Sequence, residues 1–317
     1  MKWIVLFSLL AAGNVSFAED FSGLFFRLQS QGKDGLSGAA GYAHLMVTDP
    51  LGRKTGYDPA AREEIKQIPR SGYIQKSAPV GKAGIPEVKN INLNISPAVS
   101  SGVYNVVVFG ASNFRYRLKV TVDGYNGGES LNQEISGYVA SGARVEYVLK
   151  YDPAPGAPGP EIKKTASFEA LCDEVLAAQK LGYIGDAKFS GSLVKQIKLA
   201  EKLSKNCGEL NNSEGGCAPA DAVLDLFLKR LELANRKCDA KQPRECDEEP
   251  YWAEFRTKRS GESAFKDFFR EWDLSDWQKS KKTAKRSLSD EALKIIKADS
   301  GALLTRKPPA VGALAAP

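Results

Sequence analysis

Five cysteines, one histidine and a pair of closely spaced aspartates are the residues of this sequence that could support a reaction or bind a metal ion. The only histidine is His44. Hydrolases that use serine or cysteine as a nucleophile need a neighbouring base, most often an imidazole. His44 lies in an expected strand, and the segment GESAF at 261–265 lacks the second glycine of a nucleophile elbow. The sequence therefore predicts a protein that is not an enzyme.

A pair of carboxylates is the one catalytic device that the composition leaves open, because glycosidases use two acidic side chains and no histidine. An extracellular hydrolase with such a pair stays an alternative. The glycine-rich stretch GKDGLSGAAG at 32–41 matches neither the spacing of a phosphate-binding loop nor the dinucleotide-binding fingerprint. We therefore expect no cofactor.

The N-terminal residues 1–18 have the parts of a secretory signal peptide. Lys2 supplies a positive start, residues 3–12 are mostly apolar, and the small residues Ser16 and Ala18 precede an expected cleavage point after Ala18. The apolar run is shorter than the roughly 20 residues that cross a bilayer. The sequence predicts a secreted, periplasmic or cell-surface protein with no transmembrane segment after cleavage.

All five cysteines lie in the second half of the chain, and an oxidising compartment makes them disulfide candidates. A zinc site would favour C-x-x-C pairs, and none is present, so we expect no metal there. The expected disulfides join Cys207 to Cys217 and Cys238 to Cys246, which leaves Cys172 unpaired. An alternative joins Cys172 to Cys207 or Cys217, and the sequence does not choose between these pairings.

The stretch TDPLGRKTGYDP at 48–59 is a candidate binding loop. Its DPLG segment has Asp, Pro and Gly at the first, second and fourth positions, as a type I turn prefers. The residues that could contact a ligand are Asp49, Arg53, Lys54, Tyr57 and Asp58. An EF-hand beginning at Asp49 would need oxygen-bearing side chains at its third, fifth and twelfth positions, and none occurs. A looser calcium site formed by Asp49 and Asp58 stays an alternative.

The first half of the chain alternates in the manner of β-strands. In FRYRLKVTV at 114–122 every second residue is apolar, which places one set of side chains in a core and the other in water. Further strands are expected at 21–28, 42–47, 91–95, 103–109 and 143–151. Short strands separated by Gly, Pro and Asn predict an antiparallel β-sandwich over 19–151. The segment at 152–164, which is rich in Pro and Gly, predicts a linker.

Three segments of this half together resemble a domain of secreted bacterial proteins. They are DPLGRKTGYDP at 49–59, EIKQIPRSGY at 64–73, and the strand pair SGVYNVVVFGASNFRYRLKVTVDGYNGG at 101–128. The resemblance implies an extracellular, immunoglobulin-like accessory module, and it implies no defined activity.

After the linker the apolar residues recur with a helical period. Phe168, Leu171, Val175 and Ala178 form one stripe. Similar stripes predict a helical bundle over 165–247 and a C-terminal helical segment over 248–306, followed by a disordered tail at 307–317.

The patterns "L..A.KLGYI......SL..QI.LAEKL" and "A..LDLFLKRLE" of residues 165–238 resemble the FIMAH-type module of bacterial extracellular proteins. This resemblance implies attachment to extracellular enzymes or adhesins, and no catalytic residue comes with it. Together the two halves predict an α+β protein of two domains, in which an immunoglobulin-like β-sandwich precedes a small disulfide-braced helical bundle.

A basic run near the C-terminus consists of Lys279, Lys281, Lys282, Lys285 and Arg286. The whole chain has 44 Lys and Arg against 38 Asp and Glu, an excess too small for a dedicated nucleic-acid binder. We expect a non-catalytic binding or adhesion-associated protein whose partner is an extracellular protein or glycan. Besides the hydrolase, the alternative is an envelope-surface protein that binds anionic lipid or polysaccharide through the basic run.

Overall fold

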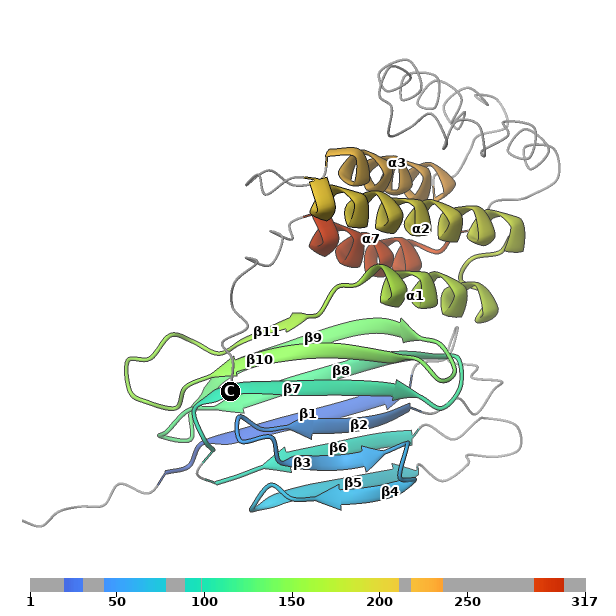
Figure 1. Cartoon of the computed structure of the whole chain (residues 1–317). Coiled ribbons are helices and arrows are strands. Elements are labelled where there is room, and N and C mark those ends of the chain that lie inside the picture. Colours follow the sequence, from blue (N-terminus) through green and yellow to red (C-terminus); the bar gives the residue numbers. More distant parts are fainter. Residues whose placement is uncertain are drawn as a thin grey trace, which may run out of the picture.

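The computed structural model describes residues 20–30, 43–77, 89–97, 99–210, 218–235 and 288–304. Within these residues the chain is mostly β, with eleven strands in two antiparallel sheets and four helices beside them (Figure 1). None of the four described helices combines the length with the apolarity that a membrane-crossing segment requires.

The first sheet has five strands in the order β5-β6-β1-β8-β9. Their bounds are β1 Gly23–Ser30, β5 Ser71–Ser77, β6 Lys89–Ile95, β8 Phe114–Asp123 and β9 Glu129–Val139. The second sheet has six strands in the order β11-β10-β7-β2-β3-β4. Their bounds are β2 Ala43–Thr48, β3 Lys54–Asp58, β4 Glu63–Lys66, β7 Gly102–Gly110, β10 Arg144–Tyr151 and β11 Glu161–Lys164.

The alternating apolar residues of the strands form one core between the two sheets. Phe26 of β1 faces Val120 of β8 in the register of the five-stranded sheet, and both are buried. Leu45 of β2 and Val106 of β7 belong to the same cluster from the six-stranded sheet. Strict alternation therefore positions every inward side chain, because a slip of one residue would turn the apolar set toward water.

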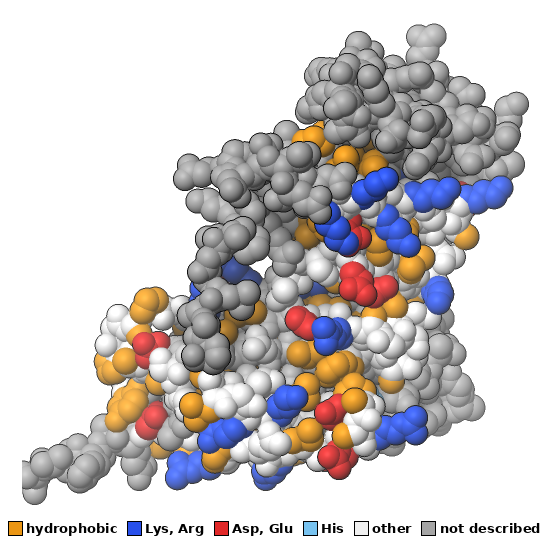
Figure 2. All heavy atoms as spheres, viewed as in Figure 1, with side chains coloured by type: hydrophobic (Ala, Val, Ile, Leu, Met, Phe, Trp, Pro, Cys, Tyr) orange, Lys and Arg blue, Asp and Glu red, His pale blue; other side chains and the backbone are white. Residues whose placement is uncertain are grey.

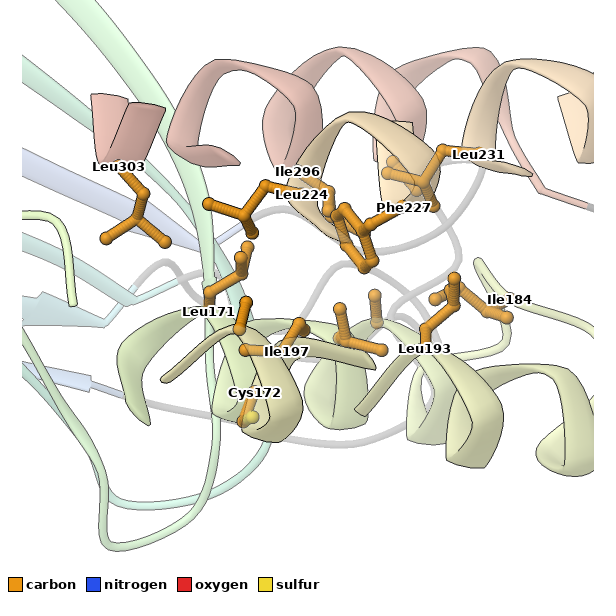
Figure 3. Packing of buried hydrophobic residues seen from close by; sticks show 14 of the residues in the cluster. Leu171, Cys172, Ile184, Leu193, Ile197, Leu224, Phe227, Leu231, Ile296 and Leu303 are labelled. Carbon is orange, nitrogen blue, oxygen red and sulfur yellow. The ribbon is translucent and has the colours of Figure 1, made fainter. Parts of the chain in front are cut away.

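The helices are α1 Phe168–Lys180, α2 Ala187–Leu210, α3 Ala218–Asn235 and α7 Asp290–Leu304. Ser167 caps α1, because its side-chain oxygen accepts a hydrogen bond from the Ala170 N–H at 3.0 Å. Side chains of all four helices point toward one another in a second core, which includes Leu171, Ile197, Phe227 and Ile296 (Figure 3).

The second core does not end at the helices. Tyr138 of β9 is fully buried within it, and α1 packs against β9. Arg115 of β8 donates to the Tyr183 hydroxyl at 3.3 Å and forms an ion pair with Glu291 of α7. The four helices thus cover one edge of the two sheets, near the strands β9 and β11 (Figure 1).

The predicted fold class is wrong. The structure shows two antiparallel sheets of eleven strands with four helices packed on them, and not an immunoglobulin-like β-sandwich followed by a helical bundle. Periodicity located strands and helices one at a time, but the order of strands within a sheet depends on contacts between distant segments. The linker also ends early, since Glu161–Lys164 forms β11 and pairs with β10.

The disulfide brace is also wrong. The part of the chain that the structure describes contains no disulfide, and Cys172 is a free, buried thiol in the core of the helices. The side chain of Cys207, and the residues Cys217, Cys238 and Cys246, lie outside what the structure describes. Apolar packing holds the described helices together. Cys172 takes part in it as a small apolar residue, since it lies on the same buried stripe of α1 as Leu171 and Val175.

We predict that Cys172 is chemically silent in the folded protein. Burial raises the pKa of its thiol to about 11, so little thiolate is present at pH 8. With an aromatic disulfide reagent at pH 8, native wild-type protein and Cys172→Ala should show the same number of reactive thiols. In guanidinium chloride the wild-type protein should show one more. An extra reactive thiol in the native wild-type protein would contradict the burial.

Candidate functional site

The candidate loop after β2 is a turn organised by Asp49. The buried carboxylate of Asp49 accepts hydrogen bonds from the backbone N–H groups of Leu51 and Arg53 at 3.0 and 2.8 Å. The Arg53 guanidinium donates to the other oxygen of the same carboxylate, with a distance of 2.7 Å from Nε. The Gly52 N–H closes the turn by donating to the Asp49 carbonyl at 3.0 Å. Both carboxylate oxygens are thus engaged inside the turn.

The other loop residues are dispersed. The Lys54 N–H donates to the Gln67 side chain, and the Tyr57 ring stacks on His44 with 3.8 Å between centroids. Asp58 accepts from the Ala60 N–H at the far end of β3. The strand β3 therefore separates Asp58 from Asp49, and the described residues contain no group of three side chains that could hold a metal ion. The loop brings no calcium ligands together.

The basic run from Lys279 to Arg286 lies outside the described residues, as do the helical segment before residue 288 and the tail at 307–317. On the face of the molecule that Figure 2 shows, Lys and Arg side chains are interspersed with Asp and Glu side chains.

The first cluster of charged side chains that the sequence did not indicate is buried where the helices meet the sheets. Lys164 of β11 lies between Glu174 of α1 and Asp299 of α7. Its ammonium is 3.2 Å from Glu174 Oε1 and is also hydrogen-bonded to Asp299 Oδ2. Glu174 Oε1 accepts a further bond from the Tyr138 N–H of β9 at 3.2 Å. One ammonium therefore joins two strands and two helices.

Two carboxylates share this one ammonium, so one of them tends to keep a proton. Burial raises the pKa of Glu174 well above its ordinary value; Lys164 opposes this effect, and Asp299 adds to it. Glu174 Oε2 is buried and accepts no hydrogen bond from the described residues, while the Asp299 carboxylate lies within hydrogen-bonding reach. We interpret Glu174 as a neutral acid that keeps its proton and donates a hydrogen bond to Asp299, so Lys164 and Asp299 form the ion pair.

This cluster does not have the geometry of a glycosidase pair. In those enzymes two carboxyl groups flank the sugar at about 5–10 Å from each other. Here both carboxyl groups contact the same ammonium, and Glu174 is 1% exposed. A pocket of about 540 Å³ beside the cluster is lined partly by Tyr147, Lys164 and Asp299 but not by Glu174. The cluster is suited to joining elements rather than to catalysis.

The second feature is a group of exposed and half-exposed residues on the outer face of the five-stranded sheet, which we call the outer patch. It consists of Phe25, Arg27, Ile74, Asn92, Asn94 and Lys119. Leu24, Phe26 and Leu28 of β1 point into the core, so Phe25 and Arg27 between them point away from it. Phe25 is 37% exposed and Ile74 is 50% exposed.

Two glycines shape the outer patch. A Cβ atom at Gly23 would lie 2.6 Å from Cε2 of Phe25, so the Phe25 ring folds down over the backbone of Gly23. A Cβ atom at Gly72 would lie 2.7 Å from Oδ1 of Asn94, so the Asn94 amide reaches across β5. Both side chains therefore lie against the sheet, in space that any other residue type would fill.

The asparagines of β6 are a departure from strand chemistry. Asn90, Asn92 and Asn94 alternate with three buried apolar residues, and all three are half-exposed. Asparagine is depleted in strands because its side chain competes for backbone hydrogen bonds. The pattern NINLNI indicates a strand through its apolar residues, and this signal assigns no role to its asparagines. A local departure of this kind is expected at a functional site.

Comparison of the chain with family models, with curated proteins and with solved structures gives no match.

We predict that Lys164→Met destabilises the fold strongly. Removing the ammonium leaves the Asp299 charge in a largely buried position, and breaking a buried pair in this way costs about 3–5 kcal/mol. The free energy of unfolding in urea measures this loss. The control is Lys163→Met, because the neighbouring Lys163 is 71% exposed. Equal stability of the two variants would contradict a stabilising role for the Lys164 cluster.

We predict that Glu174→Gln makes stability less dependent on pH. A carboxyl whose pKa is higher in the folded state binds more protons there, so its contribution to stability declines as pH rises from the unfolded pKa through the folded one. Glutamine cannot ionise and keeps the donor toward Asp299. Between pH 5 and pH 8 the free energy of unfolding should fall more for the wild-type protein than for the variant. The exposed Glu169→Gln should behave like the wild-type protein, and identical slopes for all three proteins would overturn the protonation of Glu174.

Proposed function

We propose that this chain is a secreted, non-catalytic binding protein that binds a glycan through the outer patch. The observation that carries this proposal is the exposed Phe25 ring laid over Gly23 beside the half-exposed amide of Asn94. The register of the sheet places these two residues directly opposite each other. The proposed location rests on the signal-like residues 1–18.

The chemistry of the outer patch matches that of a sugar. A pyranose ring presents C–H groups on its faces and hydroxyl groups around its rim. The negative face of an aromatic ring attracts the positively polarised C–H groups. An asparagine amide offers two donors and one acceptor oxygen, and a hydroxyl is both a donor and an acceptor. Phe25 can therefore stack on a sugar ring while Asn94 or Asn92 bonds to its hydroxyls.

A flat sheet face suits a polymer better than a small molecule, since small-molecule sites are concave pockets that bury most of the ligand. The nearest outer neighbours of Phe25 are Asn94, Thr121 and Arg27, which are polar, whereas apolar residues fill the centre of a protein interface. These properties favour a glycan over a protein partner. A protein partner would instead bind with affinity that no free glycan reduces.

The hydrolase alternative has one specific pair of acids near the outer patch. Asp123 pairs with Gly23 in the sheet register and with Glu129 of β9. Burial, and then the charge of Glu129, raise the pKa of Asp123. If this pair cleaved the bound glycan, incubation would release new reducing ends, and Asp123→Asn with Glu129→Gln would abolish that release. We expect no release, because the pair lies on an open sheet face that does not exclude water.

We predict that Phe25→Ala weakens glycan binding at least tenfold, which corresponds to about 1.4 kcal/mol. The measurement is affinity electrophoresis or calorimetry against a panel of soluble plant, algal and bacterial polysaccharides. Phe109→Ala is the matched control, because Phe109 lies on the outer side of β7 in the other sheet. Unchanged melting temperatures show that both variants are folded. Binding by Phe25→Ala equal to wild type, or no binding of any polysaccharide by the wild-type protein, would sink the proposal.

A further inference from the structure

Resting on the proposed function, we propose that the glycan is acidic and that Arg27 and Lys119 bind its carboxylate or sulfate groups. Arg27 of β1 is exposed and lies directly opposite Lys119 of β8 in the sheet register. Both side chains belong to the outer patch, next to Phe25. This proposal specifies that the ligand is acidic. It also specifies that the acidic group lies beside the sugar that stacks on Phe25.

Two cations directly opposite each other are an unfavourable choice for a sheet. Like charges at paired positions repel each other and weaken the strand pair. One carboxylate, that of Glu134, is in this row directly opposite Lys119, and its ion pair is with Arg117 at 2.9 Å. Three cations therefore face one acid in this part of the sheet. A bound anion between Arg27 and Lys119 would relieve the repulsion.

The chemistry of Arg27 suits an acidic group on a sugar. Its guanidinium is a planar fork that can bind a carboxylate or sulfate through two hydrogen bonds in exchange for its contacts of 3.0 and 3.1 Å with the Gln29 amide, while Lys119 adds a compact point charge. Asn92 is the register partner of Arg27 on its other side, so it can bond to the hydroxyls next to the acidic group. The three side chains form a row across β6, β1 and β8.

The spacing relates this row to the aromatic residue. Phe25 and Arg27 are two residues apart on the same face of β1, a distance of about 7 Å. Asn94, Phe25 and Thr121 form one row across the sheet, and the charged row lies beside it. A sugar stacked on Phe25 therefore places its own acidic group, or that of the adjoining sugar, above Arg27 and Lys119.

The acids near the outer patch fix the direction of the ligand. Asp123 and Glu129 lie at the end of the face where the Phe25 ring covers Gly23. Arg27 and Lys119 lie on the other side of Phe25. An acidic group is repelled at the first end and attracted at the second, so the bound polymer has one favoured orientation.

The test uses the full mature chain and three soluble polymers: polygalacturonate, a sulfated glycosaminoglycan and uncharged hydroxyethyl cellulose. Dissociation constants are measured by calorimetry at 50 and 200 mM NaCl. We expect at least tenfold tighter binding of one or both acidic polymers than of the neutral one, with weaker binding at the higher salt. The two acidic arms distinguish carboxylate from sulfate, and either supports the inference.

Variants separate the inference from the proposed function. Arg27→Gln with Lys119→Gln should lower affinity for the acidic polymer at least tenfold and leave affinity for a neutral one unchanged. Phe25→Ala should weaken both. Lys150→Gln is the control for loss of a surface cation outside the outer patch, because Lys150 is exposed on β10 of the other sheet.

The outcomes distinguish failure of the acidic ligand alone from failure of the glycan-binding function as well. Equal binding of acidic and neutral polymers that depends on Phe25 would overturn the acidic ligand and keep the glycan-binding function. Acidic binding that ignores Phe25, or that falls as much with Lys150→Gln as with the double variant, would show non-specific attraction to a cationic protein and overturn both. Absence of binding to every polymer would also overturn both.

Discussion

The buried ammonium of Lys164 is the interaction on which the arrangement of this fold depends. Lys164 is the last residue of β11, the edge strand of the six-stranded sheet. Its ammonium contacts one acid from α1 and one from α7. Glu174 also accepts the N–H of Tyr138 from β9, the edge strand of the other sheet. Exposed strand edges invite pairing with other chains, and covering them with helices removes that hazard. Burial of so many charges is tolerable only because each one finds a partner.

This joint also determines which surface is left for binding. The helices reach the outer side of the five-stranded sheet at Arg115 and Tyr138, near one end of β8 and of β9. Phe25 and Asn94 lie farther along the same sheet and stay open to solvent. A sheet whose β9 edge is held by the helices keeps the spacing of its outer residues constant, which the proposed stacking site needs.

Some of this could be predicted from the sequence. Alternation in FRYRLKVTV located β8 and its buried side, because a period of two is a local property. Lys164 and Asp299 are 135 residues apart, and no local pattern connects them. The prolines that precede Lys164 predict a linker at 152–164, and no local pattern there indicates a strand. The cysteines suggested a brace, but Cys172 proved to be an ordinary apolar contact of α1, since spacing cannot distinguish a buried thiol from a disulfide.

The glycines at 23 and 72 show that the contour of the outer patch depends on its smallest members. Neither contributes a contact atom beyond its backbone, yet each leaves the space that atoms of a neighbouring side chain occupy. Related chains could therefore keep every visible side chain of this surface and still lose its contour through one added methyl group. The history of this contour among related chains is therefore better traced through those two small residues than through the aromatic ring itself.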